Sequence, residues 1–334
     1  MHMSDTQYDV TAIGNAIVDI IGRCEDAYLG QIGADKGSMR LVDAKTIDNI
    51  YEGMGPAVEI SGGSAANTMA GVASFGGSAG FIGRVADDEF GRIFSHDIRS
   101  IGVNFSGGPV ANGSPTSRSL ILVTPDGERT MNTFLGISTE FDPEALDRDL
   151  IANSAIVYLE GYLFDSDTAK AAFREAVTIA KGAGRKVALT LSDGFCVDRH
   201  RAEFLEFIRS GIDIVFANEN EIKSLYQAAD FDSAADQASR DIALAVLTRS
   251  AKGSVVFEKG NPTVIAPYAI AKVVDTTGAG DLYAAGFLYG YSKGLGVEKA
   301  GRLASLAAYE IISHIGARPE RNLAEMAKES GLIG

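Results

Sequence analysis

The sequence has few cysteines and fewer positively than negatively charged residues. Its two cysteines, Cys24 and Cys196, have no metal-ligand spacing among 334 residues, so we expect idle thiols and a reducing, cytoplasmic location. There are 30 Lys and Arg against 44 Asp and Glu, a formal net charge of −14. Nucleic acid and anionic membrane both require a basic surface, so neither is an expected partner. A small anionic substrate is still compatible, because backbone N–H groups can bind phosphate.

Long apolar runs and the common nucleotide loops are also absent. The apolar stretch from Val10 to Ile21 is interrupted by Asn15 and Asp19 and has no basic leader. We therefore expect neither a signal peptide nor a membrane span. No G-x-x-x-x-G-K-[ST] occurs, and no G-x-G-x-x-G follows a strand, which argues against a Walker-type NTPase and a Rossmann dehydrogenase.

The second half of the chain alternates between strand and helix patterns. This order predicts right-handed crossovers and an α/β fold of three layers: a doubly wound, mostly parallel sheet with helices on both faces. Ligands of such sheets bind at the carboxyl ends of the strands. A buried strand is predicted near the start of the chain, at 8–21. From about residue 154 the predicted strands are 155–159, 187–191, 212–216 and 243–247, and the predicted helices are 168–180, 201–209 and 219–227.

Two segments interrupt the alternation. Residues 23–42 are polar and glycine-rich, and residues 117–135 alternate as strands do around the turn Pro125-Asp126-Gly127. We expect a small β-sheet lid formed by about 23–42 and 110–136. No linker or internal repeat marks a second folding unit, so residues 1–334 are expected to form a single domain.

The stretch VVDTTGAGDLYAAG, residues 273–286, places a carboxylate at a helix start. Apolar residues at helical spacing follow Asp281, and Gly278 and Gly280 precede it. A first helical turn has free N–H groups and the positive end of the helix dipole, which together form an anion site. From these residues alone, Asp281 could equally be an ordinary helix cap.

A second glycine-rich stretch runs from Ser61 to Gly91. Gly62 and Gly63 fit a flexible joint or a close approach of the backbone, and Asn67 can donate and accept hydrogen bonds at once. The alternative is a glycine-rich connection between a strand and a helix.

Together the two stretches resemble the signatures of the ribokinase-like kinases of the phosphofructokinase B type. Gly62-Gly63-x-x-x-Asn67, with Gly83 and Asp87-Asp88-Glu89-Phe90-Gly91, is similar to the first signature. Asp275-Thr276-Thr277-Gly278-Ala279-Gly280-Asp281 is similar to the second. Both occur in the family's order and at its spacing, and the similarity extends over nearly the whole chain.

The resemblance implies phosphoryl transfer from ATP. Gly278, Ala279 and Gly280 would form an anion hole for the transferring group, and Asp281 would be the general base that takes the proton of the acceptor hydroxyl. Positioning and charge stabilisation are the main tasks of a protein in this chemistry.

Further matches imply the nucleotide and ion sites. Asn218 and Glu221 resemble the N-x-x-E motif, in which Glu221 would hold Mg²⁺ through water. Thr248, Ser250 and Gly253 resemble the nucleotide loop, although Ser250 stands where the family has glycine. Family members often bind a monovalent cation such as K⁺ near the positions of Asp275 and Thr277.

The acceptor side resembles the adenosine kinase branch. Gly14-Asn15-Ala16-Ile17-Val18-Asp19-Ile20 matches the stretch in which asparagine and aspartate line the sugar site. A carboxylate accepts two hydrogen bonds from a vicinal diol, so Asp19 suits any furanoside. The resemblance also implies acceptor contacts from Gly63, Ser64 and Asn67.

A base pocket is expected on the lid. Met131, Thr133 and Leu135 share one face of a strand by alternation, which suits either a purine or ordinary lid core. The aromatic residue that stacks on adenine in this branch has two candidates, Phe164 and Phe195.

The sequence thus predicts an ATP- and Mg²⁺-dependent kinase acting on the primary hydroxyl of a ribose-containing molecule, with adenosine converted to AMP as the first choice. A kinase of free ribose, fructose or a related furanose is the alternative within the class. A non-catalytic ligand-binding protein on the same fold is the alternative outside it. We expect a monomer or a homodimer.

Overall fold

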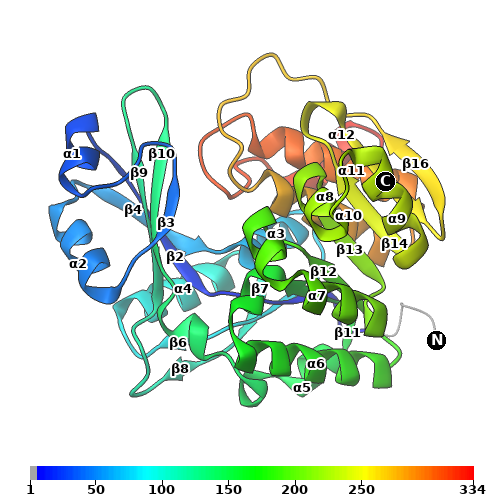
Figure 1. Ribbon diagram of the computed structural model, residues 1–334, viewed down its shortest axis with the longest axis horizontal. Coiled ribbons are helices and arrows are strands. Elements are labelled where there is room, and N and C mark those ends of the chain that lie inside the picture. Colours follow the sequence, from blue (N-terminus) through cyan, green and yellow to red (C-terminus); the bar gives the residue numbers. More distant parts are fainter. Residues whose placement is uncertain (1–5) are drawn as a thin grey trace.

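The computed structural model describes residues 6–334 and contains two main sheets (Figure 1). Within these residues, a nine-stranded sheet forms the larger part of the molecule and a five-stranded sheet stands beside it. The short strands β6 (Val85–Ala86) and β8 (Pro109–Val110) pair separately. No helix in this part of the chain is long and apolar enough to cross a bilayer.

The large sheet is mostly parallel, as predicted. Within residues 6–334, its antiparallel pairs are β14–β15 and β15–β16, at one edge. In spatial order the strands are β16 (Asn261–Ile265), β15 (Ser254–Glu258), β14 (Leu244–Thr248), β13 (Ile214–Asn218), β12 (Lys186–Thr190), β11 (Ser154–Glu160), β1 (Tyr8–Ile13), β5 (Ala79–Ile82) and β7 (Val103–Ser106).

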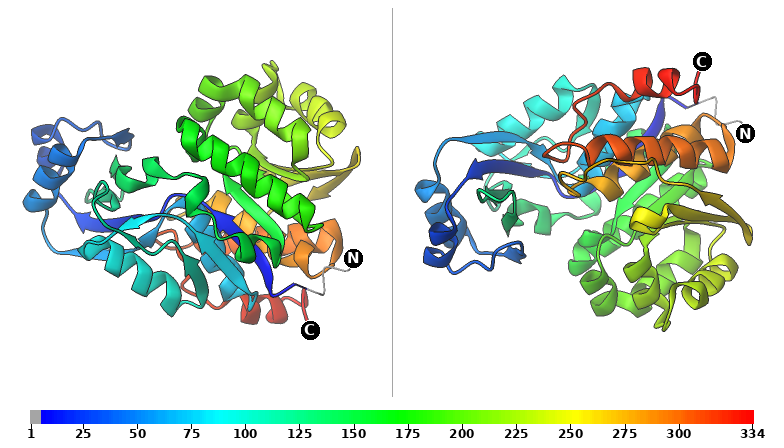
Figure 2. Two further views of the ribbon diagram at one scale, coloured as in Figure 1. Left: turned by 90° about the horizontal axis from the view of Figure 1, so that it is seen from below. Right: turned by 90° about the horizontal axis from the view of Figure 1, so that it is seen from above.

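Both faces of the large sheet are buried because successive side chains point to opposite sides. Ile156 and Tyr158 belong to one hydrophobic cluster, whereas Val157 and Leu159 belong to the other. Figure 2 shows the two groups of helices on opposite sides of the strands. The first face is covered by α3 (Ser64–Ser74), α10 (Ala279–Ser292), α11 (Gly296–Ile311) and α12 (Leu323–Glu329), and the second by α5 (Arg148–Ala152), α6 (Asp167–Gly182), α7 (Gly194–Gly211), α8 (Glu219–Tyr226) and α9 (Phe231–Asp241).

The five-stranded sheet, called here the small sheet, has one covered face. Its order is β3 (Met39–Leu41), β10 (Arg129–Phe134), β9 (Ser117–Val123), β2 (Ile17–Arg23) and β4 (Ala57–Gly62). Val18, Ile20, Leu120 and Leu122 belong to a core that includes residues of α1 (Asp26–Gln31), α2 (Ala44–Gly53) and α4 (Glu89–Ser100). Figure 1 shows α1 and α2 on the outer side of this sheet.

The three-layer doubly wound fold and the additional small sheet confirm the predicted fold class. The prediction of one strand over residues 8–21 is wrong: β1 ends at Ile13, β2 begins at Ile17, and the two strands belong to different sheets. The predicted hairpin of residues 117–135 forms β9 and β10. Segment 23–42 supplies α1, β3 and the last residue of β2, whereas the rest of β2 and all of β4 lie outside the two segments expected to build the small sheet.

Candidate active site

A cavity of about 380 Å³ lies at the carboxyl ends of the large sheet, where the small sheet faces it. Thr190, Asn218 and Thr248 line this cavity, and each is the last residue of its strand. This is the position expected for a ligand of a doubly wound sheet.

Asp281 lies in this cavity, in the first turn of α10, but its side chain does not cap that helix. Its carboxylate accepts hydrogen bonds from Ser64 Oγ (2.6 Å) and Asn67 Nδ2 (3.2 Å), both on α3. The two glycine-rich stretches of the sequence therefore meet at one carboxylate. Burial raises the pKa of Asp281, while the two hydrogen bonds and the charge of Arg318 oppose that rise.

The turn before Asp281 forms the N-terminal end of α10. Gly278 is the N-cap residue with φ of 76°, a left-handed conformation that favours glycine. A Cβ on Gly278 would lie 3.0 Å from Ala317, whereas nothing lies within 4 Å of a Cβ on Gly280. The N–H groups of Gly280 and Asp281 lie in the first turn, where a helix offers no acceptor. The N–H of Ala279 instead donates to Thr276 O (3.2 Å).

Asp275, at the start of the same motif, is held from several sides. Its Oδ1 accepts from the N–H (3.0 Å) and the hydroxyl (2.8 Å) of Thr277. Its Oδ2 accepts from Gly316 N (3.0 Å) and lies 2.9 Å from Nη1 of Arg129. Asp275 thus fixes the path of the chain that leads into α10.

Asp19, on β2, lines the same cavity from the small sheet. A Cβ on Gly62 would lie 2.2 Å from its Oδ2, so only glycine at position 62 permits this approach. Burial raises the pKa of Asp19 to about 7, with Asp281 adding to the rise and the cations Arg318 and Arg129 opposing it. The two predicted carboxylates thus face the same enclosed space.

Asn15 lies next to the site rather than in it. Its Nδ2 donates to Oε1 of Glu160 (2.9 Å), and Oε2 of Glu160 accepts from Ala65 N (2.9 Å). Burial raises the pKa of Glu160 to about 7. Gly63, with φ of 93°, comes just before α3, and a Cβ there would lie 2.4 Å from Asn15 O. Asn15 and Gly63 therefore shape the connection that presents Ser64.

The face of the small sheet turned toward the cavity carries Asp19, Ser119, Ile121 and Met131. Cross-strand pairing of Asp19 with Ser119, and of Ile121 with Met131, places them on one face. Thr133 shares the face, but its hydroxyl bonds to that of Ser119 (3.0 Å) and it does not line the cavity.

The expectation for Leu135 does not hold. Strand β10 ends at Phe134, and Leu135 precedes the 3-10 helix Gly136–Glu140 with helical φ and ψ. Alternation along the strand therefore no longer applies to it, and it is absent from the cavity lining.

The residues expected to adjoin the nucleotide lie at the ends of β13 and β14 or shortly after them. Asn218 and Glu221 form a capping box at the start of α8: Asn218 Oδ1 accepts from Glu221 N (2.9 Å), and Glu221 Oε2 accepts from Asn218 N (2.9 Å). Glu221 is only 5% exposed yet lines the cavity, and burial raises its pKa to about 7. Its carboxylate is thus held in place by the protein, so it can orient water more readily than it can move toward a metal.

The residues expected to form the nucleotide loop lie only partly at the cavity. Thr248 lines it, but Ser250 and Gly253 do not. Ser250 has φ of 51°, so it adopts the left-handed conformation that glycine would take at this position. A Cβ on Gly253 would lie 2.2 Å from Ile265 O, which explains the glycine there by packing against β16.

The two aromatic candidates differ completely in exposure. Phe164 is 2% exposed and stacks on Phe204 with ring centroids 4.0 Å apart, so it belongs to the core. Phe195 is 78% exposed at the start of α7, three residues after Ser192, which lines the cavity. Only Phe195 remains free to contact a ligand.

Sequence reasoning missed several residues of the site. Tyr162 lines the cavity, and Glu160 anchors Asn15. Glu160 ends a correctly predicted strand, so its position at the carboxyl edge was a usable signal. Arg318 donates to Ser61 O (2.6 Å) and Ala66 O (2.9 Å), and its charge acts on both Asp19 and Asp281. No local pattern marks Arg318, because its partners are distant in sequence.

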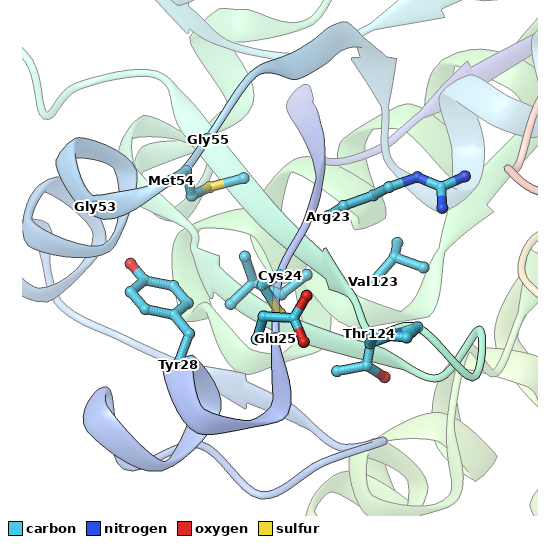
Figure 3. A pocket seen from close by; sticks show the side chains of 11 residues that line it. Arg23, Cys24, Glu25, Tyr28, Gly53, Met54, Gly55, Val123 and Thr124 are labelled. Atoms are coloured by element: carbon cyan, nitrogen blue, oxygen red, sulfur yellow. The ribbon is translucent and has the colours of Figure 1, made fainter.

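A second cavity, of about 490 Å³, lies at the other end of the small sheet (Figure 3). Arg23, Cys24, Glu25 and Tyr28 are among its lining residues, and none of the predicted site residues is. Tyr28 donates its hydroxyl hydrogen to Ile50 O (3.0 Å), and burial raises the pKa of Cys24, which disfavours the reactive thiolate. Within the described residues, the predicted site residues that line a cavity, Asp19 and Asp281 among them, line the first one.

Comparison with known proteins identifies the class. Residues 55–322 match the pfkB family of carbohydrate kinases, and the chain belongs to that family. It is 32% identical over 267 residues to an ATP-dependent ribose-1-phosphate kinase of Halopiger xanaduensis, which covers 77% of this chain and 82% of that protein.

Two solved structures are more similar. One is an adenosine kinase from Sinorhizobium meliloti, with a TM-score of 0.90 and 52% identity, covering 97% of this chain and 99% of that one. The other is described as a probable sugar kinase from Rhizobium etli CFN 42, with a TM-score of 0.91 and 49% identity over 98% of this chain and 100% of that one. The protein is thus a sugar or nucleoside kinase that transfers a phosphoryl group to a hydroxyl acceptor.

Proposed function

We propose that the protein phosphorylates the 5′-hydroxyl of a ribonucleoside at the expense of ATP, with adenosine converted to AMP. The observation that carries this proposal is the placement of Asp281 and Asp19 in one cavity, between the open end of α10 and an apolar part of the small sheet. The identity of 52% to a protein described as an adenosine kinase supports the same choice of acceptor.

In this proposal Asp281 is the general base. Ser64 and Asn67 hold its carboxylate, so that a free lone pair can accept the proton of the 5′-hydroxyl as the oxygen attacks the γ-phosphorus of ATP. The P–O bond to ADP breaks as the new P–O bond forms. The N–H groups of Gly280 and Asp281 and the dipole of α10 stabilise negative charge on the transferring group.

The acceptor is oriented by the small sheet. Asp19 would accept hydrogen bonds from the 2′- and 3′-hydroxyls of the ribose. Ile121 and Met131 offer an apolar surface for the base, and Phe195 could cover it from α7. The apolar contact contributes on the order of 25 cal/mol per Å² removed from water.

On the opposite side, Asn218, Glu221 and Thr248 would adjoin the phosphates of ATP. Mg²⁺, when bound with ATP, neutralises phosphate charge during transfer. The rigid capping-box geometry of Glu221 suits an interaction with this ion through water rather than direct ligation.

A free sugar is the second candidate acceptor, because a protein of 49% identity is described as a probable sugar kinase. An acceptor that already carries phosphate fits the site less well. Among the described residues, the carboxylates of Asp19, Glu221 and Asp281 line the cavity, and no lysine or arginine does. Its charge thus favours an uncharged acceptor beside the ATP phosphates.

The test is ADP release with adenosine, inosine, ribose, fructose and ribose 1-phosphate, accompanied by calorimetric binding. We expect turnover with adenosine and little with the sugars. Turnover of a free sugar without adenosine binding would overturn the nucleoside assignment, and binding of acceptors without any turnover would indicate a non-catalytic protein.

A pair of variants tests the base pocket. Met131→Asp should weaken adenosine binding by at least about tenfold, because it removes apolar contact and adds a buried charge. Met39→Asp is the matched control: Met39 is the cross-strand neighbour of Met131 on β3, but it is half exposed and does not line the cavity. Equal effects of the two changes would contradict a base pocket at Met131.

A further inference from the structure

The chain segment that leads into α10 has a charged partner on the small sheet. Nη1 of Arg129, the first residue of β10, lies 2.9 Å from Oδ2 of Asp275, and each side chain is only 8% exposed. Arg129 belongs to the small sheet, whereas Asp275 precedes α10, which covers the large sheet. The two residues are 146 positions apart in the chain. The pair thus joins the small sheet to the segment that shapes the anion hole.

The carboxylate of Asp275 has no oxygen left without a partner. Oδ1 accepts two hydrogen bonds from Thr277, and Oδ2 accepts one from Gly316 in addition to its contact with Arg129. A monovalent cation at this carboxylate would have to displace the guanidinium or lie beside it. Like charges at such a distance repel, most strongly where water is excluded.

Arg129 is suited to act as a permanent positive charge. A guanidinium keeps its proton under all ordinary conditions. Although burial lowers the pKa of Arg129, the charges of Asp275 and Asp19 oppose this effect. Neither terminal nitrogen completes a hydrogen bond within the described residues, so the contact with Asp275 is a charge contact and not a bidentate pair.

We propose that Arg129 is a positioning residue for phosphoryl transfer, whose guanidinium takes the place of a monovalent cation at Asp275. From the small sheet it supplies the charge that holds Asp275, and through Thr277 and Gly316 it fixes the turn that ends at Gly278. The kinase should accordingly need no K⁺ or related ion. The proposal rests on kinase activity but not on which acceptor is used.

The test compares the wild type with Arg129→Gln and Arg129→Lys, using the acceptor that gives turnover in the panel above. K⁺ is titrated against tetramethylammonium at constant ionic strength. We expect less than about twofold change of wild-type kcat with K⁺, and at least about tenfold loss in Arg129→Gln without K⁺, because the anion hole is displaced. K⁺ should restore part of that loss, and Arg129→Lys should remain insensitive to K⁺.

A second readout separates positioning from a merely structural role. The thermal unfolding midpoint should rise with K⁺ in Arg129→Gln but stay constant in the wild type. Arg23→Gln is the matched control, since Arg23 and Arg129 both pair with Val123 in the small sheet but Arg23 is exposed. Figure 3 shows the Arg23 side chain beside the second cavity. Arg23→Gln should behave as the wild type in both measurements.

Two results would overturn the proposal. One is a rise of wild-type turnover by about tenfold or more when K⁺ is added, since such a rise equals the loss expected for a misplaced site. The other is an Arg129→Gln variant with wild-type turnover in the absence of K⁺. Failure of adenosine as an acceptor would leave both readouts intact with a sugar, so the nucleoside assignment and the role of Arg129 can fail independently.

Discussion

At the scale of single residues, the site depends on carboxylates that are difficult to ionise. Asp281 and Asp19 line one cavity, and burial raises the pKa of both. Arg318 opposes the rise at both positions from a place where it also binds the backbone at Ser61 and Ala66. The hydrogen bonds of Arg318 thus fix a positive charge that favours the ionised forms of Asp281 and Asp19, although Arg318 does not line the cavity.

Asp281→Asn should lower turnover without lowering the stability of the fold. The change keeps the shape but removes the proton acceptor, so turnover should fall by about a hundredfold to ten-thousandfold while acceptor binding persists. Because the folded pKa of Asp281 is raised, its contribution to stability is fully present below about pH 4, the unfolded value, and is lost as pH rises through the folded pKa. Calorimetry should therefore find the variant more stable than the wild type near about pH 8, with the difference vanishing in acid.

Asp232→Asn is the control for that experiment. Asp232 lies in the first turn of α9, as Asp281 does in α10, but it is exposed. It should leave turnover unchanged, because Asp232 does not line the cavity. Near-wild-type turnover of Asp281→Asn would contradict its assignment as the base.

The raised pKa of Asp281 also predicts an unusual acid limb in the rate profile. A general base works only when deprotonated, so kcat falls as pH falls through its pKa. Since burial raises that pKa, the decline should begin well above the value of about 3.9 for an ordinary aspartate. Measurement of kcat against pH at saturating substrate checks this, and a flat profile down to that value would be inconsistent with Asp281 as the base.

At the scale of elements, the site depends on the connection from β4 into α3. Gly63 has φ of 93°, and a Cβ there would lie 2.4 Å from Asn15 O. Gly63→Ala should cost about 1–3 kcal/mol of strain and displace Ser64 or the β1–β2 connection. We expect acceptor affinity and turnover to fall together, as measured by calorimetry and steady-state kinetics.

Gly182→Ala serves as the comparison for Gly63→Ala. Gly182 is the last residue of α6, nothing lies within 4 Å of a Cβ there, and its φ is not left-handed. It should leave affinity and turnover unchanged. If Gly63→Ala were equally silent, the connection would have no role in placing Ser64.

The helices and strands also show which parts of the fold local sequence patterns can predict. Alternation and helical spacing located β11 to β14, most of α6 and α8 and part of α7, because each of these patterns is complete within one segment. Strands β5, β7, β15 and β16 of the same sheet were not predicted. The break between β1 and β2 was not predicted. It arises at Gly14, where a Cβ would lie 2.4 Å from Oε2 of Glu160, and at Asn15, which bonds to the same carboxylate. Partners 145 positions apart leave no local signal.

For the candidate site, the two glycine-rich motifs were a better guide than the alternation of residues along strands. They singled out Asp281, Ser64 and Asn67, whose side chains are hydrogen-bonded to one another in the structure; the acceptor contacts expected of Ser64 and Asn67 stay a prediction. Leu135 was misplaced because a period of two was continued past the end of β10. Arg129 was overlooked because its partner, Asp275, is reached only through the packing of one sheet against the other.

At the scale of the whole molecule, the cavity belongs to two sheets at once. Asp19, Ile121 and Met131 come from the small sheet, whereas Asp281 belongs to a helix on the large one. An acceptor that contacts both parts should hold them together, and closure would exclude water from the transferring group. Binding should therefore slow hydrogen exchange in the small sheet even where the ligand does not touch it.

We expect adenosine to slow amide exchange of residues 117–134 and 17–23, measured by mass spectrometry with and without the nucleoside. Asp281→Asn should retain this protection, because its loss of the base leaves the acceptor contacts in place. Asp19→Ala should lose it at the same adenosine concentration, because the link from ribose to the small sheet is gone. Protection confined to α10, or equal protection in the wild type and Asp19→Ala, would show that the small sheet does not close on the acceptor.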